Sequence, residues 1–234
     1  EVFTPVESKQ LTYQQKKDSL NAINLIKENW CGKIKGRTVC DGRKQRHIYS
    51  PEDVLSPALS QDSFFATLAI DALEKKYVAT SDIAGAFLKA DQDNFVIVRL
   101  RDAAVDAMLE INENKYTPFV TNEKGMKVIY VRLLKAMYGT LTAPILWYKL
   151  FASTIMEMGF VINPYDLCVA NKEINGKQMT ICWYVDDLKV SHVDENEVKT
   201  MIEKLEQKFG KRSTTYGHRH TYVGMDITIK NGEV

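Results

Sequence analysis

The chain of 234 residues has few cysteines, no long apolar run, no internal repeat and almost no net charge. Its four cysteines show no Cys-x-x-Cys spacing, so neither a zinc site nor a disulfide framework is expected. No apolar stretch approaches the length that crosses a bilayer, and the first residues carry no signal-peptide pattern, so we expect no membrane association. A net charge of +1 does not exclude a nucleic-acid partner, because a basic groove can coexist with an acidic remainder.

The most informative segment present is residues 181–190, ICWYVDDLKV, in which two aspartates lie between short apolar runs. Neighbouring side chains of a straight strand point to opposite faces, so Asp186 and Asp187 can serve one site only if the backbone turns there. The bend contains no glycine and has aromatic neighbours, which is unfavourable for two like charges unless a cation lies nearby. The segment predicts a β-hairpin with a metal-binding turn; a solvated surface turn is the alternative.

A second acidic strand precedes this hairpin in the chain. Residues 77–88, YVATSDIAGAFL, begin as a β-prone run, place Asp82 near its end and continue through small residues. Sites that hold two metal ions about 3.5–4 Å apart need carboxylates from more than one element. Magnesium prefers oxygen ligands and completes its coordination with water and substrate phosphates. Asp82 together with Asp186 and Asp187 therefore predicts a site for Mg²⁺ or Mn²⁺.

Basic side chains are concentrated in one segment that contains a single acid, Asp41. The six are Lys33, Lys35, Arg37, Arg43, Lys44 and Arg46. Such a cluster could contact phosphate groups, and an ordinary solvated loop is the alternative. His218 and His220 have no further histidine or cysteine nearby to complete a ligand set, so they are not expected to bind metal.

Hydrophobic periodicity predicts a chain of mixed α and β structure. Apolar spacing and terminal signals indicate helices over residues 20–26 (ending by Gly32), 60–73, 144–159 and 198–209. The second of these should pack under the strand that carries Asp82, and the aromatic residues Trp147 and Phe151 of the third are interpreted as core. Residues 117–131 are predicted to form a hairpin with Gly125 in its turn.

The acidic hairpin is one of five segments that resemble, in the same order, motifs of the reverse transcriptases of copia-type LTR retrotransposons. Residues 184–187 resemble the Tyr-x-Asp-Asp box, and residues 82–88 resemble the first aspartate motif. Residues 135–144, with the Trp-Tyr pair that follows, are similar to the family segment Leu-Tyr-Gly-Leu-Lys-Gln-Ala-Pro. Residues 35–39, with Gln45, resemble the fingertip segment, and residues 222–227 resemble the primer grip. Chance does not readily produce five motifs in family order over most of a chain.

Four positions depart from the family pattern. Asp41 and Arg43 stand where the family usually has a basic or small residue and an aromatic residue, respectively. Thr140 and Thr142 replace the usual Leu and Gln after the Tyr-Gly pair. These departures concern the details of nucleotide contact and leave the three aspartates in place.

The resemblance implies an α+β, right-hand polymerase fold that consists of fingers and palm and lacks a thumb. The fingers would comprise residues 1–80 and 92–134, and the palm residues 81–91 and 135–234, ending at the primer-grip segment. A split β-α-β palm would carry the catalytic carboxylates. Family members continue into a thumb and an RNase H domain, so association with those regions or an oligomer is expected.

The resemblance also implies an RNA-directed DNA polymerase that adds deoxynucleotides to a primer 3′-hydroxyl by a two-metal mechanism. Asp82, Asp186 and Asp187 would be the catalytic residues and, with the backbone carbonyl of Ile83, the ligands of Mg²⁺ or Mn²⁺. The nucleotide would be bound by Lys35, Arg37, Phe87, Tyr138 and Gly139. The primer grip would be formed by Tyr222, Gly224 and Met225.

Phe87 would block the 2′-hydroxyl of a ribonucleotide in this scheme, and simple core packing is the alternative for this ring. The implied partners are an RNA or DNA template with its primer, and deoxynucleoside triphosphates. A membrane is not expected among the partners. The implied location is intracellular, in a cytoplasmic particle, the nucleus or both.

Three alternative functions follow from the same residues. A domesticated, non-catalytic nucleic-acid-binding module would keep the fold and the basic residues, but it would have no reason to keep Asp82, Asp186 and Asp187 together. An RNA-dependent RNA polymerase is disfavoured by the bulky Phe87. An unrelated enzyme with a chance Asp-Asp turn would leave the other four motifs unexplained.

Overall fold

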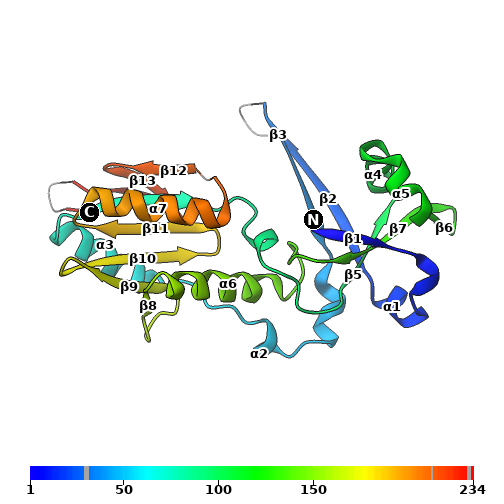
Figure 1. Ribbon diagram of the computed structural model, residues 1–234, viewed down its shortest axis with the longest axis horizontal. Coiled ribbons are helices and arrows are strands. Elements are labelled where there is room, and N and C mark those ends of the chain that lie inside the picture. Colours follow the sequence, from blue (N-terminus) through cyan, green and yellow to red (C-terminus); the bar gives the residue numbers. More distant parts are fainter. Residues whose placement is uncertain (29–31, 212, 231–232) are drawn as a thin grey trace. The chain divides into compact units, whose positions relative to one another are not determined.

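The computed structural model describes residues 1–28, 32–211, 213–230 and 233–234, and the chain forms two compact units (Figure 1). Unit 1 comprises residues 1–55 and 87–146, and unit 2 comprises residues 56–86 and 147–234. The fingers and palm limits expected from the sequence stay a prediction; the compact units place residues 56–80 with the Asp82 strand, and residues 87–91 and 135–146 with the N-terminal part. Cys31, one of the four cysteines, lies outside the described residues.

Unit 1 is built on a six-stranded sheet in the order β1-β7-β5-β2-β3, with β6 paired to β7. Its strands are β1 (Phe3–Val6), β2 (Leu20–Glu28), β3 (Ile34–Cys40), β5 (Ile97–Arg101), β6 (Thr121–Glu123) and β7 (Met126–Leu133). Its helices are α1 (Tyr13–Asp18), α2 (Pro51–Val54), α4 (Ala103–Ile111) and α5 (Glu113–Tyr116), with the short 3₁₀ helices η1 (Ser8–Gln10), η2 (Gly42–His47) and η4 (Thr117–Phe119). A further 3₁₀ helix, η3 (Ala86–Lys89), begins at the last residue of unit 2 and continues in unit 1.

The segment expected to be a helix over residues 20–26 is strand β2, so that prediction is wrong. β2 pairs with β3 from Ala22↔Cys40 to Glu28↔Ile34, and its first residues pair with β5. Only the start of β2 is anchored in the core: Leu20 is buried, whereas Leu25 and Ile26 are exposed. Apolar residues that resemble one face of a helix therefore lie along a two-stranded ribbon, where pairing with β3 decides the conformation.

The hairpin expected over residues 117–131 is confirmed. β6 and β7 pair from Thr121↔Val128 to Glu123↔Met126. The two-residue turn is Lys124 and Gly125, both with positive φ, and a glycine favours this conformation. β7 continues as a buried central strand of unit 1, with Ile129 and Val131 in its core.

Unit 2 is built on a second six-stranded sheet, in the order β12-β4-β11-β10-β9-β8, and a separate hairpin of β13 and β14. Its strands are β4 (Tyr77–Asp82), β8 (Val161–Ile162), β9 (Val169–Ile174), β10 (Lys177–Tyr184), β11 (Asp187–His192), β12 (Ser213–Tyr216), β13 (Arg219–Tyr222) and β14 (Met225–Thr228). Its helices are α3 (Gln61–Leu73), α7 (Glu195–Phe209) and all but the first turn of α6 (Ala143–Glu157). These three helices confirm the predictions for residues 60–73, 144–159 and 198–209.

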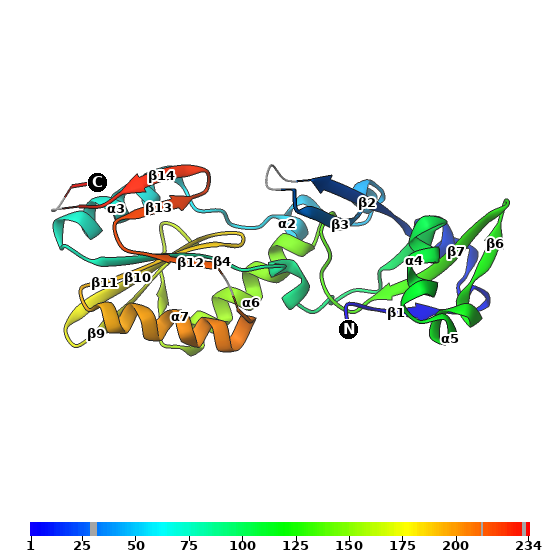
Figure 2. The ribbon, with the colours of Figure 1, turned by 90° about the horizontal axis from the view of Figure 1, so that it is seen from above.

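The two faces of the unit 2 sheet are covered by different elements (Figure 2). On one face, α3 and the β13–β14 hairpin share a core with Val78 of β4, in which Phe64 and Tyr222 stack with ring centroids 4.7 Å apart. This confirms that the helix over residues 60–73 packs against the Asp82 strand. On the other face lie α6 and α7; Phe151 of α6 contacts the ring of Trp183 in β10, and Phe209 of α7 packs on Trp147 and Phe151.

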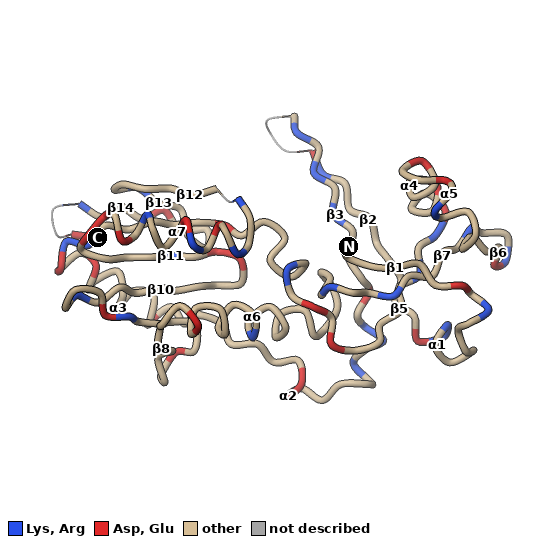
Figure 3. Tube along the Cα trace, in the orientation of Figure 1, with Lys and Arg blue, Asp and Glu red and all other residues tan. Residues whose placement is uncertain are grey.

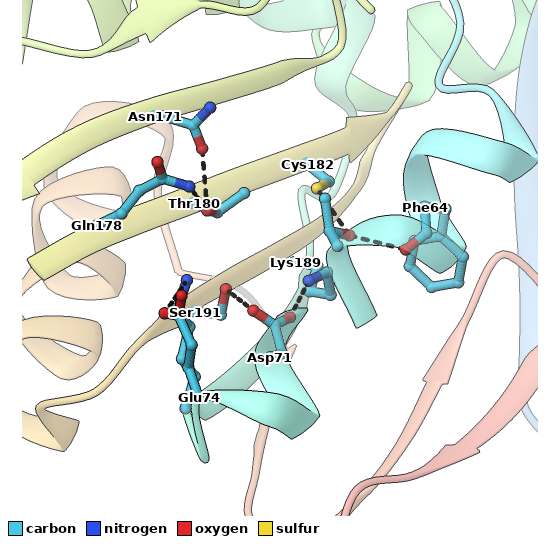
Figure 4. A network of polar contacts seen from close by, with 11 residues as sticks. Phe64, Asp71, Glu74, Asn171, Gln178, Thr180, Cys182, Lys189 and Ser191 are labelled. Carbon is cyan, nitrogen blue, oxygen red and sulfur yellow. Dashed lines mark hydrogen bonds and ion pairs between the residues drawn. The ribbon is translucent and has the colours of Figure 1, made fainter. Parts of the chain in front are cut away.

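A buried ion pair joins α3 to strand β11 (Figure 4). The ammonium of Lys189 contacts one carboxylate oxygen of Asp71, and Ser191 Oγ donates a hydrogen bond of 2.6 Å to the other. The side chains of Lys189 and Asp71 are at most 1% exposed. Because a buried charge without a partner is costly, the pair fixes α3 against the strand that begins at Asp187.

None of the helices in the described parts of the chain combines the length and the apolar composition that crossing a membrane requires.

Candidate active site

The predicted acidic hairpin is formed by β10 and β11, which pair from Thr180↔Ser191 to Tyr184↔Asp187. The turn between them consists of only two residues, Val185 and Asp186, and Asp187 is the first residue of β11. Val185 has a φ of 55°, which is uncommon for a β-branched residue because its branched side chain crowds the backbone. The turn is therefore not one that its own sequence favours.

Two backbone carbonyls of this turn are fixed by other elements of unit 2. Trp147 Nε1 donates a hydrogen bond of 2.7 Å to the Val185 carbonyl, and the Ile83 amide donates one of 2.9 Å to the Asp186 carbonyl. Trp147 is buried among aromatic rings, as the sequence predicts, but its bond to the turn was not predicted. The available signal was chemical, because a buried indole N–H usually finds an acceptor.

The three predicted catalytic aspartates are brought together at one end of the unit 2 sheet. β4 and β11 pair so that Asp82 lies opposite Asp187, and Asp186 is the adjacent turn residue. Burial raises the pKa of the Asp187 carboxyl, and the negative charges of Asp186 and Asp82 raise it further. A hydrogen bond from the backbone N–H of Val223 acts in the opposite direction. Asp187 is thus a half-buried carboxylate in a field of like charge, which a cation would relieve.

Among the described residues, no group of three or more His, Cys, Asp or Glu side chains forms a site that could hold a metal ion by itself. The donor chemistry nevertheless fits a hard divalent cation: the aspartates offer only oxygen, and their charges act on one another. Magnesium in particular does not need a full protein cage, because water and substrate phosphates supply the remaining ligands.

The predicted primer-grip residues lie on the β13–β14 hairpin and differ in exposure. Tyr222 is buried, and its hydroxyl lies 3.4 Å from the Asp187 backbone carbonyl, to which it donates. Gly224 is exposed in the turn with a φ of 75°, and Met225 is partly buried against the α3 core. The Tyr222 ring therefore packs inside unit 2, and the turn is the exposed part of this hairpin.

His220, on the same hairpin, is a buried structural residue. Its Nδ1 lies 3.1 Å from the Thr80 hydroxyl, and its Nε2 lies 2.9 Å from the Gly217 carbonyl. Burial lowers the pKa of His220, so the neutral ring accepts from Thr80 and donates to Gly217. Both ring nitrogens have protein partners, which links β13 to β4 two residues before Asp82.

Basic residues recur along strand β3 of unit 1 (Figure 3). Those on β3 are exposed, whereas two basic residues that follow it have partners within the protein. Lys35 and Arg37 are exposed on β3 and point to the same face of the β2–β3 ribbon, where Lys27 lies opposite Lys35. By contrast, Lys44 donates to the carbonyls at the end of α1, at 2.6 and 2.9 Å, and Arg43 forms an ion pair with Asp41. Asp41, which departs from the family pattern, thus has a local partner.

The other predicted nucleotide-binding residues lie at the base of this ribbon. The rings of Phe87 and Tyr138 are 4.6 Å apart, centroid to centroid, and tilted by 47°. The Tyr138 carbonyl accepts a hydrogen bond of 2.7 Å from the Cys40 amide, at the end of β3. Gly139 has a φ of 87°, and an added Cβ there would overlap the Cys40 carbonyl oxygen, so only glycine fits. Unit 1 therefore joins Phe87, Tyr138 and Gly139 to the strand of Lys35 and Arg37.

Gln45, part of the fingertip resemblance, is buried and connects the same two segments. Its side-chain oxygen accepts a hydrogen bond of 2.9 Å from the Leu141 amide. Thr140 and Thr142, which replace larger family residues, are also buried, and Thr140 Oγ1 donates 2.8 Å to the Met137 carbonyl. These positions build the loop after Tyr138.

The chain was compared with known proteins and solved structures. The chain is 22% identical over 220 residues to the transposon Ty1-BR Gag-Pol polyprotein of Saccharomyces cerevisiae, covering 92% of this chain and 11% of that polyprotein. Among solved structures, the prototype foamy virus protease-reverse transcriptase is similar with a TM-score of 0.43 and 19% identity, covering 92% of this chain and 21% of that chain. A telomerase from Candida albicans, solved with a fragment of telomeric RNA, is similar with a TM-score of 0.49 and 10% identity, covering 99% of this chain and 48% of that chain.

The chain therefore spans about a ninth of the length of the curated Ty1 relatives that it matches. A sequence model of the family described as reverse transcriptase (RNA-dependent DNA polymerase) matches residues 10–234, which is nearly the whole chain. The chain accordingly belongs to the reverse transcriptase family and corresponds to a copia-type reverse transcriptase region.

Proposed function

We propose that the chain is the catalytic part of an RNA-directed DNA polymerase, which adds deoxynucleotides to the 3′-hydroxyl of a primer on an RNA or DNA template. The observation that carries the proposal is the meeting of Asp82, from β4, with Asp186 and Asp187, from the β10–β11 hairpin. In this proposal, unit 2 is the palm and unit 1 the fingers. A non-catalytic nucleic-acid-binding module would gain nothing from three neighbouring carboxylates that repel one another.

The carboxylates are proposed to hold Mg²⁺ or Mn²⁺. Asp82 and Asp186 would bind the cations, with Asp187 beside them and the Ile83 carbonyl as a further oxygen ligand. Bound divalent cations would supply the charge that activates the primer hydroxyl and neutralises the leaving pyrophosphate. The chain itself would contribute placement: Trp147 and the Ile83 amide fix the turn that carries Asp186.

The residues of unit 1 are proposed to bind the incoming deoxynucleoside triphosphate. Lys35 and Arg37 are exposed on one face of the ribbon and would donate charge-assisted hydrogen bonds to phosphate oxygens. Phe87 and Tyr138 form one aromatic pair, with Gly139 beside them, and would bound the sugar and base. Under this proposal Phe87 discriminates against ribonucleotides by steric exclusion of the 2′-hydroxyl.

Primer extension tests the proposed activity. The purified chain should extend a DNA primer on RNA and on DNA templates with deoxynucleotides and Mg²⁺, and Asp82→Asn or Asp186→Asn should abolish extension without lowering the Tm. Asp62→Asn, a surface substitution in the first turn of α3, is the matched control and should extend as the unmodified chain does. Extension by either active-site variant at the unmodified rate would remove these residues from the chemistry. Primer–template binding without any extension would favour the non-catalytic module.

A further inference from the structure

A cleft of about 390 Å³ opens in unit 2 at the end of β4 that is opposite to Asp82. Its walls come from the end of α3, the start of β4, the first turns of α7, the end of β12 and the residues that follow β14. The size falls within the range of about 300–1,000 Å³ that is typical of small-molecule sites. None of the described residues that line it belongs to the proposed cation, nucleotide or primer contacts, so the cleft is separate from the site described above.

Hydrogen bonds fix the wall of the cleft that residues 217–230 form. The Ile229 amide donates a bond of 2.8 Å to the His218 carbonyl, and His218 Nδ1 lies 2.9 Å from the Ile229 carbonyl oxygen. Gly217, with a φ of 99°, lets the chain leave β12, and its carbonyl accepts a hydrogen bond from the buried His220 ring. The cleft is therefore a formed part of unit 2.

The floor of the cleft is apolar, and aromatic rings lie beside it. Val78 of β4, Val198 of α7 and Ile229 line the cleft and are at most 7% exposed. Tyr77 and Tyr216 also line it, but they are 51% and 43% exposed. Tyr216 pairs with the residue two positions after Tyr77, so both rings lie on one face of the sheet as diagonal neighbours. Exposed rings beside an apolar floor suit contact with a flat apolar group.

Positive charge predominates around the cleft. Lys75 and Lys230 line it, are exposed and form no ion pair with a described residue. Glu195 is the one acid among the described lining residues, and its carboxylate already pairs with Lys199 at 2.9 Å. An anion in the cleft would therefore meet cations that lack a partner.

A buried ammonium beside the cleft adds to this positive charge. The side chain of Lys76 is fully buried, and its ammonium lies 3.2 Å from a carboxylate oxygen of Glu74 without forming a hydrogen bond to any described residue. By contrast, the buried ammonium of Lys189 contacts the equally buried Asp71 carboxylate. Because the Glu74 side chain is 47% exposed, solvent weakens its compensation of Lys76. The charge of Lys76 thus remains to be offset by an anion nearby.

We propose that this cleft binds an aromatic anion, which is a flat apolar group that carries a phosphate, a sulfonate or a carboxylate. The ring would lie on the apolar floor against the two tyrosines, and the anionic group would accept charge-assisted hydrogen bonds from Lys75 and Lys230. A neutral ligand would leave these cations without a partner, and a small inorganic anion would leave the apolar floor in water. This binding site is additional to the proposed polymerase activity and does not rest on it.

Fluorescence titration of the full chain with two probes tests the inference. Anilinonaphthalene sulfonate is an aromatic anion, and phenylnaphthylamine is the same ring system without the sulfonate. Lys75→Gln combined with Lys230→Gln should weaken binding of the sulfonate probe by about tenfold or more and leave binding of the neutral probe unchanged. In the unmodified chain, added salt should weaken binding of the sulfonate probe alone.

A matched double variant separates the cleft from a general effect of charge. Lys204→Gln combined with Lys208→Gln removes the same charge from exposed positions of α7 that do not line the cleft, and it should leave the affinity for both probes unchanged. Tyr77→Ala removes one of the two rings and should weaken binding of both probes.

Two results would overturn the inference. One is an equal affinity for the sulfonate probe in the two double variants, which would place the probe elsewhere or show a general effect of charge. The other is seen in the unmodified chain and needs no variant to fold: absence of saturable binding of the sulfonate probe, or binding that salt does not weaken. Primer extension is not used as a measurement, so either result leaves the polymerase proposal standing.

Discussion

The two ends of strand β10 carry turns of the same length and opposite character. At one end, Asn175 and Gly176 connect β9 to β10 with φ values of 51° and 70°. At the other, Val185 and Asp186 connect β10 to β11, and Val185 has a φ of 55°. In the first turn both residues have positive φ, which Asn-Gly adopts readily, whereas in the second only Val185 does, and a β-branched residue is disfavoured there. The first turn is specified by its own residues, and the second is imposed by Trp147 and Ile83 from outside.

The comparison shows where unit 2 departs from local preference. A residue held in a disfavoured backbone conformation costs on the order of 1–3 kcal/mol and persists only where its surroundings determine it. The strained turn is also the one that carries carboxylates and lies opposite Asp82. The disfavoured backbone conformation is thus found in the turn at which catalysis is proposed, Val185–Asp186, and not in the Asn175–Gly176 turn at the other end of β10.

Exchanging the two turns should produce the largest effect. Val185→Asn with Asp186→Gly places an easy turn at the site, so the free energy of unfolding should rise while incorporation falls by about 10³-fold or more, since Asp186 is lost. The reciprocal change, Asn175→Val with Gly176→Asp, should lower the free energy of unfolding by about 1–3 kcal/mol and leave incorporation intact. Urea unfolding and primer extension on both double variants measure the two quantities. Loss of incorporation in the reciprocal variant would contradict the distinction between the ends.

The strands on either side of β10 can be compared through their buried polar contacts. On the β11 side, Lys189→Met leaves Asp71 as an unpaired buried charge and should cost about 3–5 kcal/mol of unfolding free energy. On the β9 side, Thr180→Val removes the 2.9 Å bond to Asn171 and should cost about 1 kcal/mol. Adding Asp71→Leu to Lys189→Met should recover most of the loss. Equal costs on both sides would show that the ion pair has no special role.

The contribution of Trp147 to the acidic turn can be tested by substitution. Trp147→Phe keeps one aromatic ring but removes the donor to the Val185 carbonyl and part of the buried ring system, so the free energy of unfolding should fall by about 1–3 kcal/mol or more and incorporation should fall with it. Tyr148→Phe, the next residue of α6, removes a weaker 3.3 Å bond to the Leu167 carbonyl and serves as control. The free energy of unfolding and the rate of primer extension should be lower for Trp147→Phe than for Tyr148→Phe. Similar values for the two variants would mean that the turn does not depend on Trp147.

The smallest expected effect concerns pH. The pKa of Asp187 is raised in the folded chain, so this carboxyl stabilises the fold most when protonated, below its ordinary pKa of about 3.9. That contribution is lost as pH rises from this value through the raised pKa. Without divalent cations, Asp187→Asn should flatten the decline of stability over that window, whereas Asn175→Asp at the opposite turn should not. Identical pH profiles for Asp187→Asn and the unmodified chain would show that the carboxyl is not perturbed.

Much of unit 2 could be predicted from its sequence because its signals are local. Ser60 caps α3 through the Ser63 amide, Gly210 ends α7 with a φ of 90°, and the acidic hairpin is bounded by β-prone residues. Asp82, Asp186 and Asp187 could be assigned to one site because the motifs that contain them occur in the order of the reverse transcriptase family. Strand β2 of unit 1 could not be predicted from its own residues. They allow a helix or a strand, and the pairing with β3 and β5 decides for the strand.

The supports of the site escaped prediction for a different reason. The Trp147–Val185 bond joins residues 38 positions apart in the chain, and although a buried indole N–H needs an acceptor, its acceptor here is a backbone carbonyl, which carries no residue-specific signal. Lys44, predicted to face phosphate, instead donates to the carbonyls of Lys17 and Ser19. A count of charges could not distinguish it from Lys35, which has the same side chain on an exposed strand.

The ion pair beneath β11 has a consequence for how this region can change over evolutionary time. Replacing either Lys189 or Asp71 alone by an apolar residue strands the other charge in the interior, so a lineage that loses one is under pressure to lose the second. The two positions, 118 apart in the chain, should therefore vary jointly among descendants of this sequence, as a Lys and Asp pair or as two apolar residues. A descendant sequence that keeps only one of the two charges would fold only if the rest of the chain is stable enough to offset the loss. The ion pair therefore limits which single substitutions this region can accept next to the aspartates.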